Sequence, residues 1–151
     1  MMAGKRRAAP PILATMTPPD TIESAHKSKS GLKRIVNAFF YSLSGFQLAF
    51  RHEHAFRQEV LLAAILLPIA CFVPVTPVER VLLIGTVLLV LIVELLNSSV
   101  EAAVDRIGLE THHLSKRAKD IGSAAVFVAL VLLALTWLLI AGPALLGLVP
   151  V

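Results

Sequence analysis

The chain has 151 residues, of which 56% are hydrophobic and 16% are charged, and its mean hydropathy is +0.78. This composition is too apolar for a water-soluble domain of this length and predicts an integral membrane protein. The net charge of +4 could attract nucleic acid, but the basic residues flank apolar segments and are not interleaved with aromatic residues, so we expect membrane lipids as partners and no nucleic acid.

The first 31 residues contain no continuous apolar run. Lys5, Arg6 and Arg7 are basic, but no hydrophobic stretch of the length that a secretory signal requires follows them. The segment is instead rich in Pro, Ser, Thr and Lys, which cannot build a buried core. We therefore predict a disordered amino-terminal tail over residues 1–31 and one membrane domain over residues 32–151.

Residues 32–50 show the periodicity of an amphipathic helix. Apolar side chains recur at spacings of one, three and four, and polar or basic side chains lie between them. This pattern is typical of a helix in the interface of a membrane, so we predict an interfacial helix here and a turn near residues 51–53. The apolar positions are Ile35, Val36, Phe39, Phe40, Leu43, Phe46 and Phe50.

Three apolar runs predict three transmembrane helices, and hence an all-α membrane fold. The first run, Val60 to Val75, is shorter than the roughly 20 residues that a bilayer requires, so the helix has to include residues 55–59 as well. The second run, Val81 to Leu96, is almost unbroken Leu, Val and Ile. The third extends from Ala124 to about Leu148 and contains Trp137.

Two prolines and one cysteine add detail to these spans. Pro68 is a candidate kink in the first span, and Gly142-Pro143 predicts a bend or an end of the third. Cys71 is the only cysteine, so no disulfide within the chain is possible, and its apolar surroundings in the sequence predict a buried thiol.

The lysine and arginine residues are distributed unevenly around the spans. Nine precede the first span, one lies between the first and the second, four lie between the second and the third, and none follows the third. Cytoplasmic loops carry the excess of basic residues in membrane proteins. We therefore predict that the amino terminus and the second loop are cytoplasmic, and that the carboxyl terminus lies outside.

Polar residues continue the helical pattern beyond the second apolar run. At 100° per residue, Glu94, Asn97, Glu101 and Asp105 fall within an arc of about 80° on one face of the helix. An ionisable side chain at membrane depth is costly unless it is paired, and three acids on one face repel one another. The stripe predicts a site that holds positive charge, although a polar seam that pairs helices would show the same pattern.

Two positive partners suit this stripe: a divalent metal ion between some of the acids, or a proton on the deepest one. Glu94 lies deepest, so loss of hydration favours its protonated form and suits it to accept a proton. Glu101 lies closer to water and suits a metal ion. The two interpretations are compatible.

The loop after the stripe is dense in groups that bind phosphate or metal. Lys119 can neutralise a phosphate, and Glu110 and His112 can contact a nucleotide. Lys119 and Asp120 are expected to open the third helix, with Ser123 one turn later. Charged loops are usually only solvated, so this pattern is weak evidence when it is taken alone.

The run His52-Glu53-His54 before the first span looks like a metal-binding cluster. Alternate residues of a helix point in different directions, so we do not expect both histidines to bind one ion, and Glu53 is the better ligand. The chain contains no Walker A motif, no kinase glycine-rich loop and no zinc-ligand spacing. Any nucleotide must therefore be bound by other means.

Three polar motifs follow one another from the second span into the third. They read Glu94-x-x-Asn97-x-x-x-Glu101-x-x-x-Asp105-Arg106, then Glu110-x-His112-x-Leu114-Ser115, then Arg117-Ala118-Lys119-Asp120-x-Gly122-Ser123-Ala124-Ala125. Upstream they are accompanied by Arg34-Ile35, Tyr41-Ser42, Gly45 and Ala55-Phe56-Arg57-Gln58-Glu59. Over about Arg34 to Trp137 the combined pattern resembles the prokaryotic integral-membrane diacylglycerol kinase family.

This resemblance implies a homotrimer in the bacterial inner membrane, with active sites shared between neighbouring subunits. The implied reaction transfers the γ-phosphoryl group of ATP to the hydroxyl of diacylglycerol, giving phosphatidic acid, with Mg²⁺ as cofactor. Glu94 would be the general base, Asn97 would position the reacting groups, and Glu53 and Glu101 would hold the magnesium ion with ATP. The implied nucleotide contacts are Arg34, Tyr41, Glu110, Thr111, His112, Lys119 and Asp120. The implied lipid contacts are Arg34, Ser42, Glu94, Ser123 and Trp137.

The sequence departs from the family pattern in its amino-terminal part. Leu43-Ser44 stands where an aromatic and basic pair would be typical, and the amino-terminal tail is longer. These differences leave the lipid open, because a related enzyme phosphorylates undecaprenol. The segments 107–110 and 122–125 are nearer to the diacylglycerol branch.

Two functions of other classes are compatible with the apolar spans. A small proton-coupled exporter would need a membrane glutamate such as Glu94, but not Glu101, Lys119 and Asp120 together. A structural membrane subunit would need none of these residues.

Overall fold

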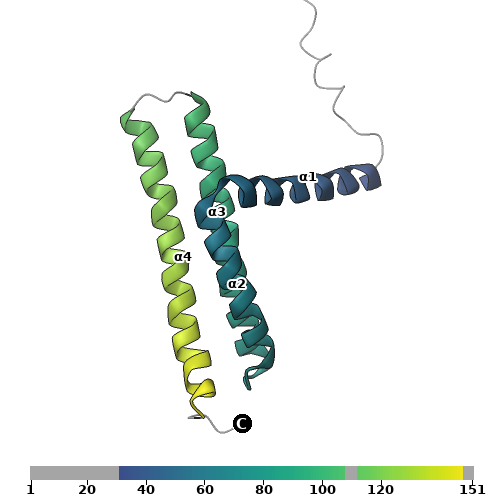
Figure 1. Cartoon of the computed structure of the whole chain (residues 1–151), viewed down its shortest axis with the longest axis vertical. Coiled ribbons are helices and arrows are strands. Elements are labelled where there is room, and N and C mark those ends of the chain that lie inside the picture. The colour runs from purple at the N-terminus through teal and green to yellow at the C-terminus, as the bar shows by residue number, and fades with distance from the viewer. Residues whose placement is uncertain (1–30, 108–111, 148–151) are drawn as a thin grey trace, which may run out of the picture. The chain divides into compact units, whose positions relative to one another are not determined.

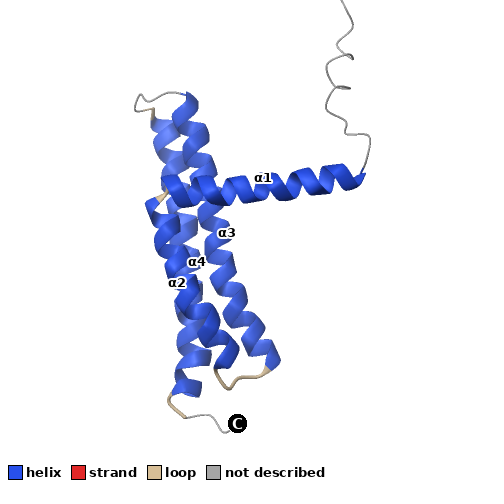
Figure 2. Cartoon of the chain, turned by 45° about the vertical axis from the view of Figure 1, so that its right-hand side comes forward, coloured by secondary structure: helices blue, strands red, loops and turns tan. Residues whose placement is uncertain are grey.

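The computed structural model describes residues 31–107 and 112–147, apart from the side chains of Leu32 and Ile107. Every regular element in these residues is a helix, as Figure 2 shows. The all-α prediction is therefore confirmed. The helices are α1 (Gly31–His52), α2 (His54–Phe72), α3 (Pro77–Ile107) and α4 (His113–Leu145), coloured along the chain in Figure 1.

The chain divides into two compact units. One comprises residues 1–40, of which the structure describes the start of α1; its described side chains are exposed there except for the half-buried Asn37. The other comprises residues 41–151 and holds the end of α1 together with α2, α3 and α4. The predicted separation of a tail over residues 1–31 from a membrane domain stays a prediction.

The predicted turn between the first two helices is a single extended residue. Glu53 has φ −101° and ψ 117° between the end of α1 and the start of α2. The Arg57 guanidinium, from the first turn of α2, donates to the carbonyl oxygens of Phe50 and Arg51 at 3.1 Å each. These bonds satisfy carbonyl groups that the end of a helix leaves without partners, and so they stabilise the junction that carries Glu53.

Helices α2, α3 and α4 are each long and apolar enough to cross a membrane. Helix α2 begins at His54, so it includes residues 55–59 as expected, but it ends at Phe72 and not at Val75. The physical reason is Pro74, which disfavours helical geometry in the residue before it; Val73 accordingly has ψ 138°. The prediction of three apolar helices of spanning length is confirmed.

Helix α3 begins at Pro77, four residues before the predicted start, because the sequence builds a capping box there. The Thr76 hydroxyl and backbone N–H both donate to a Glu79 carboxylate oxygen, at 2.7 and 2.8 Å, and the Glu79 N–H donates back to Thr76 Oγ1 at 3.3 Å. Proline suits the first position of a helix because no N–H partner is needed there.

The predicted start of the third spanning helix at Lys119-Asp120 was wrong. Helix α4 begins at His113, and His112 caps it by accepting a hydrogen bond from the Leu114 N–H on Nδ1 at 3.3 Å. No proline or glycine interrupts residues 113–119, so the charged segment continues the helix and does not form a loop. At the other end α4 passes through Pro143 and ends at Leu145.

Helix α3 is the central helix of the second unit and packs against both α2 and α4. Small residues from α2 and α4 meet larger ones from α3, which allows the backbones to approach closely. Trp137 lies against two buried clusters and donates from Nε1 to the Leu83 carbonyl at 3.2 Å. The first buried cluster is Ala63, Val87, Val90, Ala129 and Leu133, and the second is Ala70, Val73, Leu83 and Ala141.

Most of the apolar surface of the spanning helices is not covered by the chain itself. The buried share of the most apolar segment is 22% in α2, 33% in α3 and 17% in α4. Cys71 belongs to this uncovered surface, so the prediction of a buried thiol was wrong. Apolar side chains in a membrane protein can face lipid, and an apolar environment in the sequence therefore does not require burial within the protein.

Replacing Ala63 with Leu is expected to destabilise the protein by about 1–3 kcal/mol, because the added atoms have no room between α2, α3 and α4. Unfolding in mixed micelles by graded addition of a denaturing detergent measures the effect. Ala64→Leu is the matched control, because Ala64 is the next residue of α2 and is exposed. Equal destabilisation by the two variants would contradict the described packing.

Candidate active site

The polar stripe of α3 changes from buried to exposed along the helix. Glu94 is 3% exposed, Asn97 and Glu101 are half-buried, and Asp105 is exposed. All four lie on one uninterrupted helix, which confirms the helical spacing on which the stripe was predicted. The deepest acid is therefore enclosed by protein, and the acids nearer the end of α3 are accessible from water.

Two further carboxylates gather near Glu94. The charges of Glu101, on the same helix, and of Glu53, at the junction of α1 and α2, both act on Glu94. The Asn97 side chain lies against the Glu94 carboxylate and also donates from Nδ2 to Glu101 Oε1 at 3.3 Å. The structure thus brings together Glu53, Glu94, Asn97 and Glu101, the residues for which the family resemblance implies roles in catalysis and metal binding.

Asn97 fits against α4 only because Gly122 has no side chain. A Cβ atom at position 122 would overlap the Asn97 amide oxygen. That oxygen, Oδ1, is buried and has no hydrogen-bond partner among the described residues. The close approach of the two helices therefore fixes the Asn97 side chain, with Oδ1 toward Gly122 and the amide nitrogen toward Glu101.

Glu59 belongs to this cluster, although the sequence analysis gave it no role. The Glu59 side chain lies on α2 and is 8% exposed. The charge of Glu94 acts on its carboxylate, and its Oε2 atom has no hydrogen-bond partner among the described residues. The sequence did contain a signal. The buried residues Phe56, Glu59, Ala63 and Ala70 recur at spacings of three, four and seven, so Glu59 shares the packed face of α2.

Lys119 connects the start of α4 to the end of α3. Its ammonium group lies 2.6 Å from Asp105 Oδ1, and the charge of Glu101 also acts on it. Asp120 turns to its own helix, where its Oδ2 lies 2.8 Å from Lys116 Nζ. A cation is therefore available at the exposed end of the acidic stripe, while Asp120 is engaged elsewhere.

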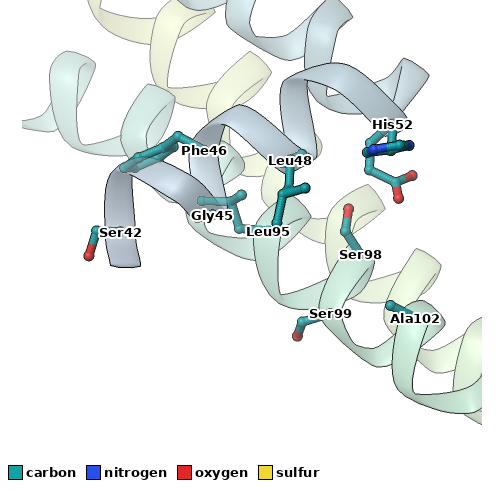
Figure 3. Close-up of a pocket in the computed structure, with 11 residues that line it drawn as sticks. Ser42, Gly45, Phe46, Leu48, His52, Leu95, Ser98, Ser99 and Ala102 are labelled. Carbon is teal, nitrogen blue, oxygen red and sulfur yellow. The ribbon is translucent and has the colours of Figure 1, made fainter. Parts of the chain in front are cut away.

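An apolar groove of about 630 Å³ runs between the end of α1 and α3. Figure 3 shows Ser42, Gly45 and Phe46 from α1 on one side, and Leu95, Ser98 and Ser99 from α3 on the other. Glu53 also lines this groove, so the groove and the acid cluster share a carboxylate. Ser98 Oγ is buried and has no hydrogen-bond partner among the described residues. The groove thus combines apolar walls with a few polar groups.

For the remaining predicted site residues, the described part of the structure shows no contact with Glu94. Tyr41, Ser42 and Ser123 are exposed, and His112 caps α4. Arg34 lies in the unit of residues 1–40. Trp137 contacts Leu83, eleven positions before Glu94 on α3 or about 16 Å along the helix axis, so the structure does not bring it to Glu94. Glu110 and Thr111 lie outside the described residues.

The fit of a magnesium ion depends on two carboxylates. Residues 31–107 and 112–147 contain no group of three or more His, Cys, Asp or Glu side chains arranged to hold a metal. Magnesium in nucleotide-using enzymes is commonly held by one or two carboxylates together with the phosphates of the substrate. Glu53 and Glu101, both half-buried near Glu94, fit that arrangement.

Comparison with known proteins identifies the family. The profile described as "Prokaryotic diacylglycerol kinase" matches residues 40–141, which is more than half of the chain. This chain belongs to the prokaryotic diacylglycerol kinase family. The resemblance predicted from the sequence motifs is therefore confirmed.

Three relatives show how much of its sequence this chain shares with other members of the diacylglycerol kinase family. It is 59% identical over 114 residues to the diacylglycerol kinase of Pseudomonas aeruginosa, an alignment that covers 76% of this chain and 93% of that protein. It is 52% identical to the Haemophilus influenzae enzyme over 72% of this chain and 92% of that protein. It is 51% identical to the Escherichia coli enzyme over 72% of this chain and 88% of that protein.

Replacing Gly122 with Ala is expected to destabilise this family member by about 1–3 kcal/mol, because the new methyl group would displace Asn97. At a helix position with free space, replacing glycine with alanine instead stabilises the folded protein by about 0.5–1 kcal/mol. Gly85→Ala on α3, where no atom lies within 4 Å of the added methyl group, is the control. Detergent unfolding compares the two, and stabilisation by Gly122→Ala would contradict the close approach.

Proposed function

We propose that this chain transfers the γ-phosphoryl group of ATP to the hydroxyl of membrane diacylglycerol, giving phosphatidic acid and ADP, with Glu94 as the general base. Membership of a kinase family makes the chain an enzyme of the phosphotransferase class. The observation that carries the proposed mechanism is the enclosed Glu94 carboxylate, whose neighbour Glu53 also lines an apolar groove.

The groove supports the proposal that the acceptor is a lipid. Its walls are mainly apolar, and a lipid chain along them would bring the polar end of the molecule to the acid cluster through Glu53. The buried Ser98 hydroxyl can bond to an oxygen of the head group. Glu94 then accepts the hydroxyl proton while the hydroxyl oxygen attacks the γ-phosphorus and ADP leaves.

Phosphoryl transfer needs positioning and charge neutralisation more than covalent help from the protein. Glu53 and Glu101 are the proposed ligands of Mg²⁺, which, when bound with ATP, neutralises part of the phosphate charge. The Asn97 amide bonds to Glu101 and lies against Glu94, so Asn97 positions both carboxylates. Lys119, paired with Asp105 at the exposed end of the stripe, supplies a cation for the phosphates.

The nucleotide and lipid contacts implied by the sequence motifs remain part of the proposal. Lys119, at the exposed end of the stripe, favours a nucleotide that approaches from the aqueous side. The proposed nucleotide contacts are Arg34, Tyr41, Glu110, Thr111, His112, Lys119 and Asp120. The proposed lipid contacts are Arg34, Ser42, Glu94, Ser123 and Trp137.

We further propose a homotrimer with shared active sites in the bacterial inner membrane. The low burial of the three apolar helices within the chain supports self-association, because a carboxylate site needs protein on all sides. The distribution of lysine and arginine supports a cytoplasmic amino terminus and second loop, and an outside carboxyl terminus. The apolar and polar periodicity of α1 supports an interfacial position.

Replacing Glu94 with Gln is expected to lower lipid phosphorylation by about 10²–10⁴-fold, the contribution typical of a general base. The assay supplies purified protein in detergent or lipid with Mg²⁺ and ATP, and offers diacylglycerol and undecaprenol in parallel. Glu79→Gln is the matched control, because Glu79 caps the opposite end of α3. Full turnover in Glu94→Gln would exclude it as the base, whereas preference for undecaprenol would change the substrate and keep the chemistry.

Replacing Glu53 or Glu101 with Gln is expected to raise the Mg²⁺ concentration for half-maximal activity by at least about tenfold, a change that even indirect alterations of a metal site produce. The measurement is lipid phosphorylation at fixed ATP over a range of Mg²⁺. Asp105→Asn removes a carboxylate of the same stripe that pairs with Lys119, and it is expected to leave the Mg²⁺ requirement unchanged. Equal shifts in all three variants would contradict the assignment of the two ligands.

A further inference from the structure

Two neighbouring serines of α3 line the apolar groove that contains Glu53, and their hydroxyl groups differ in their hydrogen bonds. The Ser99 hydroxyl donates to the Leu96 carbonyl oxygen of its own helix at 2.7 Å. The Ser98 hydroxyl oxygen is buried and has no hydrogen-bond partner among the described residues. Figure 3 shows the two side chains pointing in different directions from the helix. Of the two hydroxyl groups, that of Ser98 is the one that the described residues leave available to a ligand.

The Ser98 hydroxyl is unusual for its place in a helix. A serine inside a helix can bond back to a carbonyl oxygen three or four residues earlier, as Ser99 does. A buried hydroxyl without such a bond is costly, because it has lost its contact with water and gained no other partner. The lining of the groove is mainly apolar, so a ligand in the groove is the natural source of the missing acceptor oxygen.

The position of Ser98 relative to Glu94 limits which oxygen of a ligand could be this acceptor. Ser98 lies four residues after Glu94 on α3, which is about one turn, or about 6 Å along the helix axis. Side chains at this spacing are neighbours on a helix surface. A molecule that brings its reacting hydroxyl to Glu94 can therefore reach Ser98 with an oxygen that is only a few bonds away from that hydroxyl.

The two acceptor lipids considered from the sequence differ in this respect. In diacylglycerol, an ester carbonyl oxygen lies a few bonds from the free hydroxyl and can accept a hydrogen bond. Undecaprenol carries its hydroxyl at the end of a hydrocarbon chain and has no second oxygen. A site that hydrogen-bonds a substrate group rejects an analogue without that group, because the polar atom of the protein is then left buried and unpaired.

We propose that Ser98 is a specificity-determining residue, whose hydroxyl donates to the ester carbonyl oxygen of the acceptor lipid and so selects glycerol esters over alcohols without a second oxygen. This inference rests on the proposed lipid kinase function and adds the group by which the acceptor is recognised. Ser98 takes no part in the transfer itself. The acceptor hydroxyl gives its proton to Glu94 and its oxygen attacks the γ-phosphorus, while the bond from phosphorus to ADP breaks.

Phosphorylation of a matched pair of lipids by the full-length protein tests the inference. The pair is diacylglycerol and the dialkylglycerol diether of equal chain length, which lacks the carbonyl groups. Ser98→Ala is expected to lower kcat/KM for diacylglycerol by about five- to tenfold, the effect of one hydrogen bond, and to leave kcat/KM for the diether within about twofold. The preference for the ester over the ether should fall by the same factor.

Ser99→Ala is the matched control for this measurement. It removes a hydroxyl from the next residue of the same groove wall, but one that is already bonded to its own helix, so the ester-to-ether preference should be kept. Ser98→Thr retains a hydroxyl at the position and should retain most of the preference. Circular dichroism and size-exclusion profiles verify that each variant is folded.

A second measurement needs neither ATP nor activity. Diacylglycerol labelled with ¹³C in its ester carbonyl groups is bound to the protein in detergent, and its carbonyl stretching band is recorded by isotope-edited infrared spectroscopy. A hydrogen bond from Ser98 is expected to shift part of this band to lower wavenumber. The shift should be absent in Ser98→Ala and present in Ser99→Ala.

Two results would overturn the proposal. An unchanged ester-to-ether preference in folded Ser98→Ala would show that Ser98 does not recognise the carbonyl group. An equal loss of preference in Ser99→Ala would show that the effect belongs to the groove wall as a whole. Phosphorylation of neither lipid by the unchanged protein would instead contradict the proposed kinase function, and the infrared shift would still decide the role of Ser98.

Discussion

A carboxylate enclosed at membrane depth sets the strongest constraint on this protein. Glu94 follows a run of Leu, Val and Ile on α3 and is 3% exposed. Hydrocarbon cannot solvate an ionised side chain, so polar partners must come from protein, bound ligands or protons. Among the described residues, the Asn97 amide supplies Glu94 with a neutral hydrogen-bond partner. Glu101 on the same helix, Glu53 at the junction of α1 and α2, and Glu59 on α2 add like charge, so the cluster requires a bound cation or a proton.

The constraint on Glu94 also explains features that look unrelated to chemistry. Gly122 gives Asn97 its space, so α4 can lie close to α3 at this level. Ala63, Ala129 and Ala141 keep the neighbouring helices close by the same means. At the exposed end of the stripe, the pair of Lys119 with Asp105 joins α3 to α4 where water is accessible. The packing of Asn97 against Gly122 and the ion pair of Lys119 with Asp105 therefore both join the polar stripe of α3 to α4.

Two grooves at the end of α1 differ in the charge of the residues that line them. The groove that contains Glu53 connects apolar walls to the acid cluster, as a kinase of a neutral lipid requires. The groove that contains Arg51 and Arg57 is apolar with a basic rim and lies beside the same helix.

Sequence reasoning succeeded where the signal was local. The spacing of Glu94, Asn97 and Glu101 follows from the 3.6-residue period of any helix, and the apolar runs exceed what a water-soluble domain could bury. It failed at the start of α4, where the charged residues 113–119 were predicted to form a loop although they contain no proline or glycine and continue the helix. It also overlooked Glu59, because that acid was treated as a lead-in to the span and its place in the packed period of α2 was not considered.

By itself, the sequence determined that this chain of the diacylglycerol kinase family has three apolar segments of spanning length, with an acidic stripe at the end of the second, because hydropathy, periodicity and motif spacing are local properties. Only the tertiary structure decided which groups meet across helices. It brought Glu59 and Glu53 to Glu94, Gly122 to Asn97, and Trp137 to Leu83. These contacts depend on the register at which whole helices pack, and that register depends on many small side-chain contacts that no single segment contains.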